Sequence, residues 1–74
     1  MPTMTLMEQK LIIAMYNNPV TSKGQKIYRN KANFYTAVWK LRDAHLIISN
    51  VTREQMKEWH LTTDGQILAR VFMK

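Results

Sequence analysis

Apolar residues near the start of the chain recur at the spacing of one helix face. These residues are Met4, Met7, Leu11, Ala14 and Met15. Thr5 and Glu8 match the capping box S/T-x-x-E, in which two side chains satisfy free amides at a helix start. Asn18-Pro19 ends the pattern, because the residue before a proline avoids the α region. The sequence therefore predicts a helix over residues 5–17.

A second helical pattern covers residues 33–44, within a predicted helix of about 31–44. Its apolar face comprises Phe34, Ala37, Val38, Leu41 and Ala44, and its opposite face comprises Tyr35, Thr36, Trp39, Lys40, Arg42 and Asp43. Exposed aromatic and basic side chains together suit contacts with bases, sugars and phosphates. We favour that interpretation for Tyr35. For Trp39, burial under a neighbouring element or a partner subunit is an equally good alternative.

The segment between these helices, residues 20–30, has a weaker pattern. Thr21 or Ser22 could cap a helix, whereas Gly24 disfavours one, and only Ile27 and Tyr28 are clearly apolar. We expect a short second helix here.

Residues 46–61 predict an antiparallel hairpin. The apolar run 46–48 reads as a strand that extends to 51, residues 52–55 as a polar turn, and residues 56–61 as the return strand. Arg53 falls near the tip and Lys57 on the second arm. A last helix begins within 62–66, where threonine, aspartate and glutamine suit a helix start, and its apolar stripe comprises Ile67, Leu68, Val71 and Phe72.

The composition fits one small domain, residues 1–74, with a charge suited to polyanions. The chain has 74 residues, is 46% hydrophobic and carries a net charge of +6. Its densest basic stretch contains no acid and comprises Lys23, Lys26, Arg29, Lys31, Lys40 and Arg42. This uncancelled charge favours nucleic acid as a partner first and an anionic membrane second.

Candidate chemistry for catalysis or metal binding is sparse. The chain has no cysteine, and its two histidines, His45 and His60, lie far apart. Its few acids fall on different predicted elements, and its two glycines form no phosphate loop. Glu58 and His60 share one strand face, where a solvated pair is the more common outcome. We therefore expect no enzyme activity, no cofactor, no metal and no small-molecule ligand. No apolar run could span a bilayer, so we expect a cytoplasmic protein, associated with the nucleoid or, if viral, in the host cytoplasm.

Two segments resemble the winged helix-turn-helix family. Residues 40–47, KLRDAHLI, resemble the end of its recognition helix, K/R-L-x-x-x-G-L-I, with His45 where glycine is usual. Residues 59–65, WHLTTDG, resemble the aromatic-x-L-T-x-x-G that closes the wing and opens the next helix. The order of elements is similar to that of small MarR- and PadR-type regulators and their relatives in archaea, plasmids and viruses. The resemblance implies an α+β winged helix-turn-helix with three helices, a two- or three-stranded hairpin wing and a short C-terminal helix.

The resemblance also implies a function, sequence-specific binding of double-stranded DNA by a transcriptional regulator. Its recognition helix, about 31–44, would lie in the major groove, and its wing, about 46–61, on the backbone or in the minor groove. The base-facing residues would be Lys31, Asn33, Tyr35, Thr36 and Lys40. The phosphate-holding residues would be Thr21, Ser22, Lys23 and Lys26 before that helix, with Arg53 and Lys57 on the wing.

Members of this family usually dimerise to bind paired half-sites, so we expect a homodimer. The candidate seams are the methionine-rich first helix and the apolar stripe of the last one. Three alternative functions remain open, namely a winged-helix module for protein assembly, a binder of RNA or single strands, and, least favoured, a membrane-surface protein.

Overall fold

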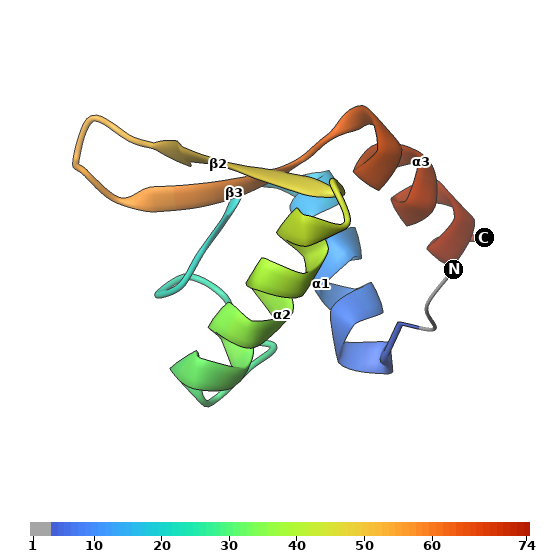
Figure 1. Ribbon diagram of the computed structural model, residues 1–74, viewed down its shortest axis with the longest axis horizontal. Helices are drawn as coiled ribbons and strands as arrows, with labels where there is room; N and C mark the ends of the chain where they lie inside the picture. The colour runs from blue at the N-terminus through green and yellow to red at the C-terminus, as the bar shows by residue number, and fades with distance from the viewer. Residues whose placement is uncertain (1–3) are drawn as a thin grey trace.

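The computed structural model describes residues 4–74 and has the expected α+β architecture (Figure 1). Its elements in chain order are α1 (Leu6–Asn17), β1 (Val20–Thr21), α2 (Lys31–Asp43), β2 (Ile47–Val51), β3 (Lys57–Leu61) and α3 (Thr63–Phe72). The strands form one antiparallel sheet in the order β1-β3-β2. Within residues 4–74, no helix has the length and apolar character to cross a membrane.

Helix α1 confirms the first predicted helix and its cap. The Thr5 hydroxyl accepts a hydrogen bond from the Glu8 amide at 3.2 Å, and a Glu8 carboxylate oxygen accepts one from the Thr5 amide at 3.0 Å. Leu11, Ile12 and Met15 enter the core, while Met7 remains exposed. The buried stripe of α1 is therefore narrower than the apolar pattern suggested.

The prediction of a short second helix in residues 20–30 is wrong. Val20 and Thr21 instead form β1, in which Val20 pairs with Trp59 and Thr21 with Glu58 of β3. The Thr21 hydroxyl then accepts a hydrogen bond from the Gly24 amide at 2.9 Å, which closes a turn. The chain therefore contributes an edge strand and a turn where we expected a helix.

The glutamine at position 25 explains why no helix continues after this turn. Its side-chain oxygen accepts hydrogen bonds from the amides of Ile27 and Tyr28 at 2.9 and 2.7 Å, and its side-chain nitrogen donates to the Tyr28 carbonyl at 2.8 Å. Gln25 thus takes up backbone groups that a helix would have paired. Ile27 and Tyr28 pack against the core from this loop.

Helix α2 confirms the second predicted helix within one residue at its end. The Asn30 side chain caps it by accepting a hydrogen bond from the Ala32 amide at 2.8 Å. After the helix, His45 adopts φ 62°, the left-handed conformation expected where the family motif has glycine. This turn directs the chain into β2, whose preceding residue Leu46 is buried.

Strands β2 and β3 confirm the predicted hairpin, which projects from the helices in Figure 1. Ile47 pairs with Leu61 at its base and Val51 with Lys57 near its tip. The base is buried and the tip is exposed. The hairpin therefore has the form of a wing, and β1 makes its sheet three-stranded, within the predicted range of two or three.

Helix α3 starts at a close contact with the turn after α2. The Thr62 hydroxyl caps α3 by accepting a hydrogen bond from the Gly65 amide at 3.1 Å, and it donates to the His45 carbonyl at 2.7 Å. A β-carbon on Gly65 would collide with the Leu46 carbonyl oxygen. Glycine is therefore required at this crossing, which accounts for the L-T-x-x-G pattern physically.

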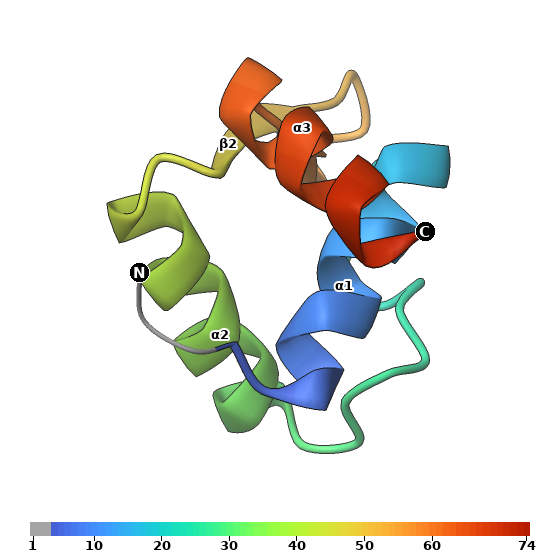
Figure 2. The same ribbon diagram turned by 90° about the vertical axis from the view of Figure 1, so that its right-hand side faces the viewer.

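The predicted apolar stripe of α3 contains both core-packed and exposed residues. Ala69 is buried and Leu68 and Phe72 pack partly against the core, whereas Ile67 and Val71 are 55% and 59% exposed. Figure 2, viewed from the end that carries α3, shows this helix beside α1. One side of α3 therefore closes the core, and the other presents apolar side chains to solvent.

Candidate nucleic-acid interface

Helix α2 packs against the rest of the protein through four buried residues and exposes its opposite side. Phe34, Ala37, Val38 and Leu41 are buried, as predicted, but Ala44 lies past the helix end and is exposed. The outermost side chains are Ala32, Thr36, Trp39 and Asp43, spaced by three and four residues. No other element of residues 4–74 covers this stripe, so α2 presents an exposed helix surface beside the wing.

Tyr35 and Trp39, which the sequence placed on one outward face, have different environments. Tyr35 is half-buried, and its ring lies edge-on to Phe34 and Trp59 with centroids 5.5 and 5.9 Å apart. Trp39 is 60% exposed and touches the body through the Tyr35 ring, 6.2 Å away. The structure therefore corrects the interpretation of Tyr35 as a fully outward group, and it shows that no element of residues 4–74 buries Trp39.

One groove lies on the wing side of α2 and has a volume of about 260 Å³. It is lined by Thr21, Ser22, Lys23, Tyr35, Gln55, Met56, Lys57 and Trp59. Five of these are residues that we expected at a DNA interface, and none of the lining residues is acidic. The turn after β1, the first half of α2 and the wing thus bring their predicted residues together although they are distant in sequence.

A second groove lies on the other flank, between α2 and α1, with a volume of about 200 Å³. It is lined by Thr5, Glu8, Tyr28, Asn33, Thr36, Ala37 and Lys40. The predicted base-facing residues are therefore divided, with Tyr35 toward the wing and Asn33, Thr36 and Lys40 toward α1.

The α1-side groove contains an ion pair that sequence reasoning missed. The Lys40 ammonium lies 3.3 and 3.2 Å from the two carboxylate oxygens of Glu8. Glu8 is only 4% exposed, whereas about half of the Lys40 side chain is accessible. The capping box identified the local role of Glu8, but no local signal pairs it with a lysine 32 residues away.

Electrostatic effects at this pair act in opposite directions on Glu8. Burial raises the pKa of the Glu8 carboxyl, but hydrogen bonds from Thr5 and the Lys40 ammonium outweigh it, so the pKa lies below its ordinary value. Burial and the Glu8 charge together raise the pKa of the Tyr28 hydroxyl. The positive charge of Lys40 is therefore partly neutralised from within the protein.

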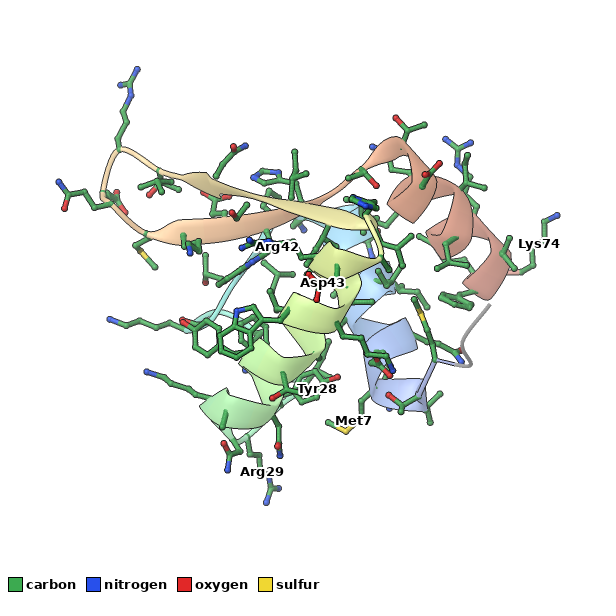
Figure 3. All side chains as sticks on the ribbon, viewed as in Figure 1. Met7, Tyr28, Arg29, Arg42, Asp43 and Lys74 are labelled. Carbon is green, nitrogen blue, oxygen red and sulfur yellow. The ribbon has the colours of Figure 1, made fainter. Side chains whose placement is uncertain are left out.

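The remaining predicted residues lie around these two grooves rather than in them. Lys31 is exposed in the first turn of α2, and Arg53 is exposed in the hairpin turn. Lys26 is exposed beside a mostly apolar hollow formed with Ala14, Pro19, Val20 and Ile27. Figure 3 shows Arg29 extending beyond the start of α2 and Arg42 near its end. These two arginines belong to the acid-free stretch, although we did not assign them to the interface.

Two further features that could bind a ligand lie away from α2. Within residues 4–74, no group of three or more histidine or acidic residues is close enough to hold a metal ion. The Glu58 carboxylate and the His60 ring lie 3.8 Å apart on the half-exposed outer face of the sheet. A hollow of about 440 Å³ between α1, β3 and α3 includes Tyr16, His60 and Arg70.

An exposed helix set beside a projecting β-hairpin, with a further helix closing the core behind it, defines the winged-helix fold. Solved structures similar to this chain confirm that fold. MepR, a transcription regulator of the Staphylococcus aureus multidrug efflux pump MepA, matches 95% of this chain with a TM-score of 0.84 and 20% identity. Lactococcus lactis ZitR in complex with DNA matches 97% of it with a TM-score of 0.83 and 21% identity.

The match leaves much of each neighbour uncovered. A mutant ZitR in its apo form gives a TM-score of 0.82 at 20% identity over 93% of this chain. The chain spans about half the length of these proteins, namely 56% of MepR and 52% and 55% of the two ZitR chains. No protein-family model and no curated protein matches the sequence.

Proposed function

We propose that this protein is a transcriptional regulator that binds double-stranded DNA sequence-specifically. In this proposal, α2 lies in the major groove and the β2-β3 wing lies on the backbone or in the minor groove. The observation that carries the proposal is the acid-free groove on the wing side of α2, where Lys23 and Lys57 flank an exposed helix. The similarity in fold to ZitR, which was solved in complex with DNA, supports DNA as the ligand.

The dimensions of α2 suit this placement. Its 13 residues extend for about 20 Å, and a helix with its side chains is roughly 10–12 Å wide. The major groove of B-form DNA is about 12 Å wide, so one helix fits. Beside it, the turn after β1 replaces the helix that we expected to hold phosphates.

The predicted residues take two kinds of role. Contacts to phosphates give affinity and register without sequence choice. This role suits Thr21, Ser22, Lys23, Lys26, Arg53 and Lys57. Contacts to base edges suit Lys31, Asn33, Tyr35, Thr36 and Lys40, since asparagine can pair with adenine and lysine with guanine. Among these, Lys40 is the weakest candidate, because Glu8 already binds its ammonium.

Selection of bound duplexes from a random pool tests the proposal directly. We expect an enriched sequence, and we expect affinity for it to fall steeply as salt rises, because bound phosphates release counterions. A protein-assembly module would give no enriched duplex and little salt dependence. A single-strand or RNA binder would prefer the unpaired strand in direct competition.

We also propose that two copies associate through the exposed side of α3. Ile67 and Val71 present an unpartnered apolar stripe there. The exposed sides of two α3 helices can pair antiparallel in a register that sets Ile67 of each copy against Val71 of the other. The same register sets Asp64 against Lys74, so the charges are complementary as well. Two α2 helices would then bind paired half-sites.

Sedimentation of the wild type and of Ile67→Glu tests the dimer. We expect the wild type to sediment as a dimer at micromolar concentration and the variant as a folded monomer. In the variant, each copy would bury one charged glutamate in an apolar interface. A monomeric wild type would refute the dimer and leave the DNA proposal standing.

The proposed function also implies a location. A regulator that binds DNA must share a compartment with it, so we propose that the protein is cytoplasmic.

A further inference from the structure

Trp39 is the largest exposed side chain on the outward stripe of α2, and it is held in place. Its ring is 60% exposed, and the Tyr35 ring lies 6.2 Å away at an angle of 35°. Tyr35 in turn lies edge-on to Phe34 and Trp59, both of which are buried. A chain of aromatic contacts therefore leads from the core to the indole, which limits its motion although solvent reaches most of it.

The residues that precede Trp39 on the same stripe are small. Thr36 and Ala32 lie one and two turns before it, toward the start of α2, and both are exposed. Small side chains let the first half of a helix approach the floor of a groove closely. The indole is then the first bulky apolar group that the groove would meet, about two-thirds of the way along the helix.

The charges around the indole favour a polyanionic ligand for this apolar surface. Lys31 and Arg42 are exposed on the same flank of α2 as Tyr35, at spacings of four and seven residues from it. Lys23 and Lys57 line the adjoining wing-side groove. Asp43 is the one acid on the outward stripe, and it lies at the far end of α2 from the small residues. Trp39 is thus an apolar contact with cations on its wing-side flank and one acid, Asp43, one turn beyond it.

We propose that Trp39 determines specificity by packing its indole against the C5-methyl group of thymine in the major groove of duplex DNA. This inference rests on the proposed function, because it requires α2 to occupy that groove. The thymine methyl is the apolar group that a base pair exposes there, and apolar side chains recognise it by contact. The indole has a single hydrogen-bond donor and no acceptor, so apolar contact is its main means of discrimination.

The shape of the surface favours a duplex over an unpaired strand. Proteins that stack unpaired bases usually present aromatic rings on a sheet or in a groove along the strand. Trp39 instead projects from the convex side of an isolated helix whose width matches the major groove. Trp59, the aromatic residue of the sheet, is buried and cannot offer a platform.

The test removes single methyl groups from the DNA. The probe is the duplex recovered from a random pool by the wild-type protein, with each thymine replaced in turn by deoxyuridine, which lacks only the C5-methyl. We expect one or two replacements near the centre of a half-site to weaken wild-type binding about fourfold each, the effect of burying one methyl group. With Trp39→Ala, the same replacements should have no effect.

Two further variants separate recognition from folding. Trp39→Phe keeps an apolar ring and should retain part of the thymine preference. Leu6→Ala removes a similarly exposed side chain from α1, outside the interface, and should bind both duplexes like the wild type. Thermal unfolding followed by circular dichroism should show that all three variants fold, because each changed side chain is largely exposed.

Each contrary result has its own meaning. Equal deoxyuridine effects in the wild type and Trp39→Ala, or none in the wild type, would overturn the thymine contact while the DNA proposal stands. Tighter binding of the unpaired strand, abolished by Trp39→Ala, would overturn it in favour of a stacking surface. Failure of the wild type to bind or enrich any duplex would refute the proposed function itself.

Discussion

The two flanks of α2 contain similar residue types but differ in what balances their positive charge. On the wing side, Lys23 and Lys57 line a groove with no acid among its lining residues. On the α1 side, Lys40 lines a groove whose floor includes the buried carboxylate of Glu8, 3.2 Å from its ammonium. Equal charges in the sequence therefore have unequal potential in the structure, and the wing side should dominate the attraction of an anion.

The difference also separates stability from function. Glu8 caps α1 and contacts α2 through Lys40, so the α1-side groove contributes to holding the helix in place. The wing-side lysines are not part of such a pair within residues 4–74. Substitutions on the two flanks should therefore have separable effects on unfolding and on DNA binding.

The largest expected effect is on stability, from Glu8→Ala. The substitution removes the capping box and the ion pair, and we expect it to lower the free energy of unfolding by roughly 2–3 kcal/mol. Chemical denaturation measures the change. Glu58→Ala is the matched control, since its partial pair with His60 lies on a solvated face and should change stability by less than about 0.5 kcal/mol. Equal losses in the two variants would contradict a special role for the α1-side pair.

Asn33→Ala should have the next largest effect, on sequence preference. If Asn33 pairs with an adenine, its loss should reduce discrimination at one base pair about tenfold, within the usual range for such contacts. Titration against the selected duplex and a scrambled one measures the change, with Asn17→Ala at the exposed end of α1 as control. Equal weakening on both duplexes would show that Asn33 does not recognise bases.

Lys23→Ala and Lys40→Ala remove the same charge from opposite flanks and form a matched pair. We expect Lys23→Ala to weaken binding to all duplexes about fivefold and to reduce the salt slope by about one. Arg53→Ala on the wing should behave similarly. Lys40→Ala should leave the slope nearly unchanged, because Glu8 already acts as its counterion. Equal slopes for Lys23→Ala and Lys40→Ala would erase the contrast between the flanks.

The smallest effect concerns acid stability. The pKa of Glu8 is lower in the folded state than its ordinary value of 4.5, so the unfolded chain binds more protons as the pH falls through this range. The stabilisation is present above pH 4.5 and is lost as the pH falls through the folded-state pKa. Glu8→Gln keeps a hydrogen-bonding cap and should flatten this dependence, by about 1 kcal/mol at most. Denaturant titrations at several acidic pH values should show parallel curves if Glu8 does not contribute.

Local patterns predicted α1, α2, the hairpin and the start of α3. The Thr5–Glu8 capping box, the Asn18-Pro19 stop and the apolar spacing act within a few residues of each other, so their signals are complete in the sequence. The left-handed conformation at His45 agrees with the motif of residues 40–47, in which glycine usually occupies this position. The prediction of a second helix was wrong for two reasons. The Gln25 side chain accepts hydrogen bonds from backbone amides of its own loop, and Val20 forms a strand pair with Trp59, which is distant in sequence.

The features of the candidate interface likewise fall into those set by local sequence and those set by long-range packing. Residue types and local periodicity are enough to locate the basic residues, to predict that α2 is amphipathic, and to predict the hairpin that follows it. Three other features depend on packing between distant segments. Glu8 partly neutralises Lys40, Tyr35 turns inward while Trp39 stays exposed, and no element of residues 4–74 covers Ile67 and Val71. Helix capping and periodicity depend on neighbours a few residues apart, whereas charge pairing and burial depend on which distant surfaces meet when the core forms.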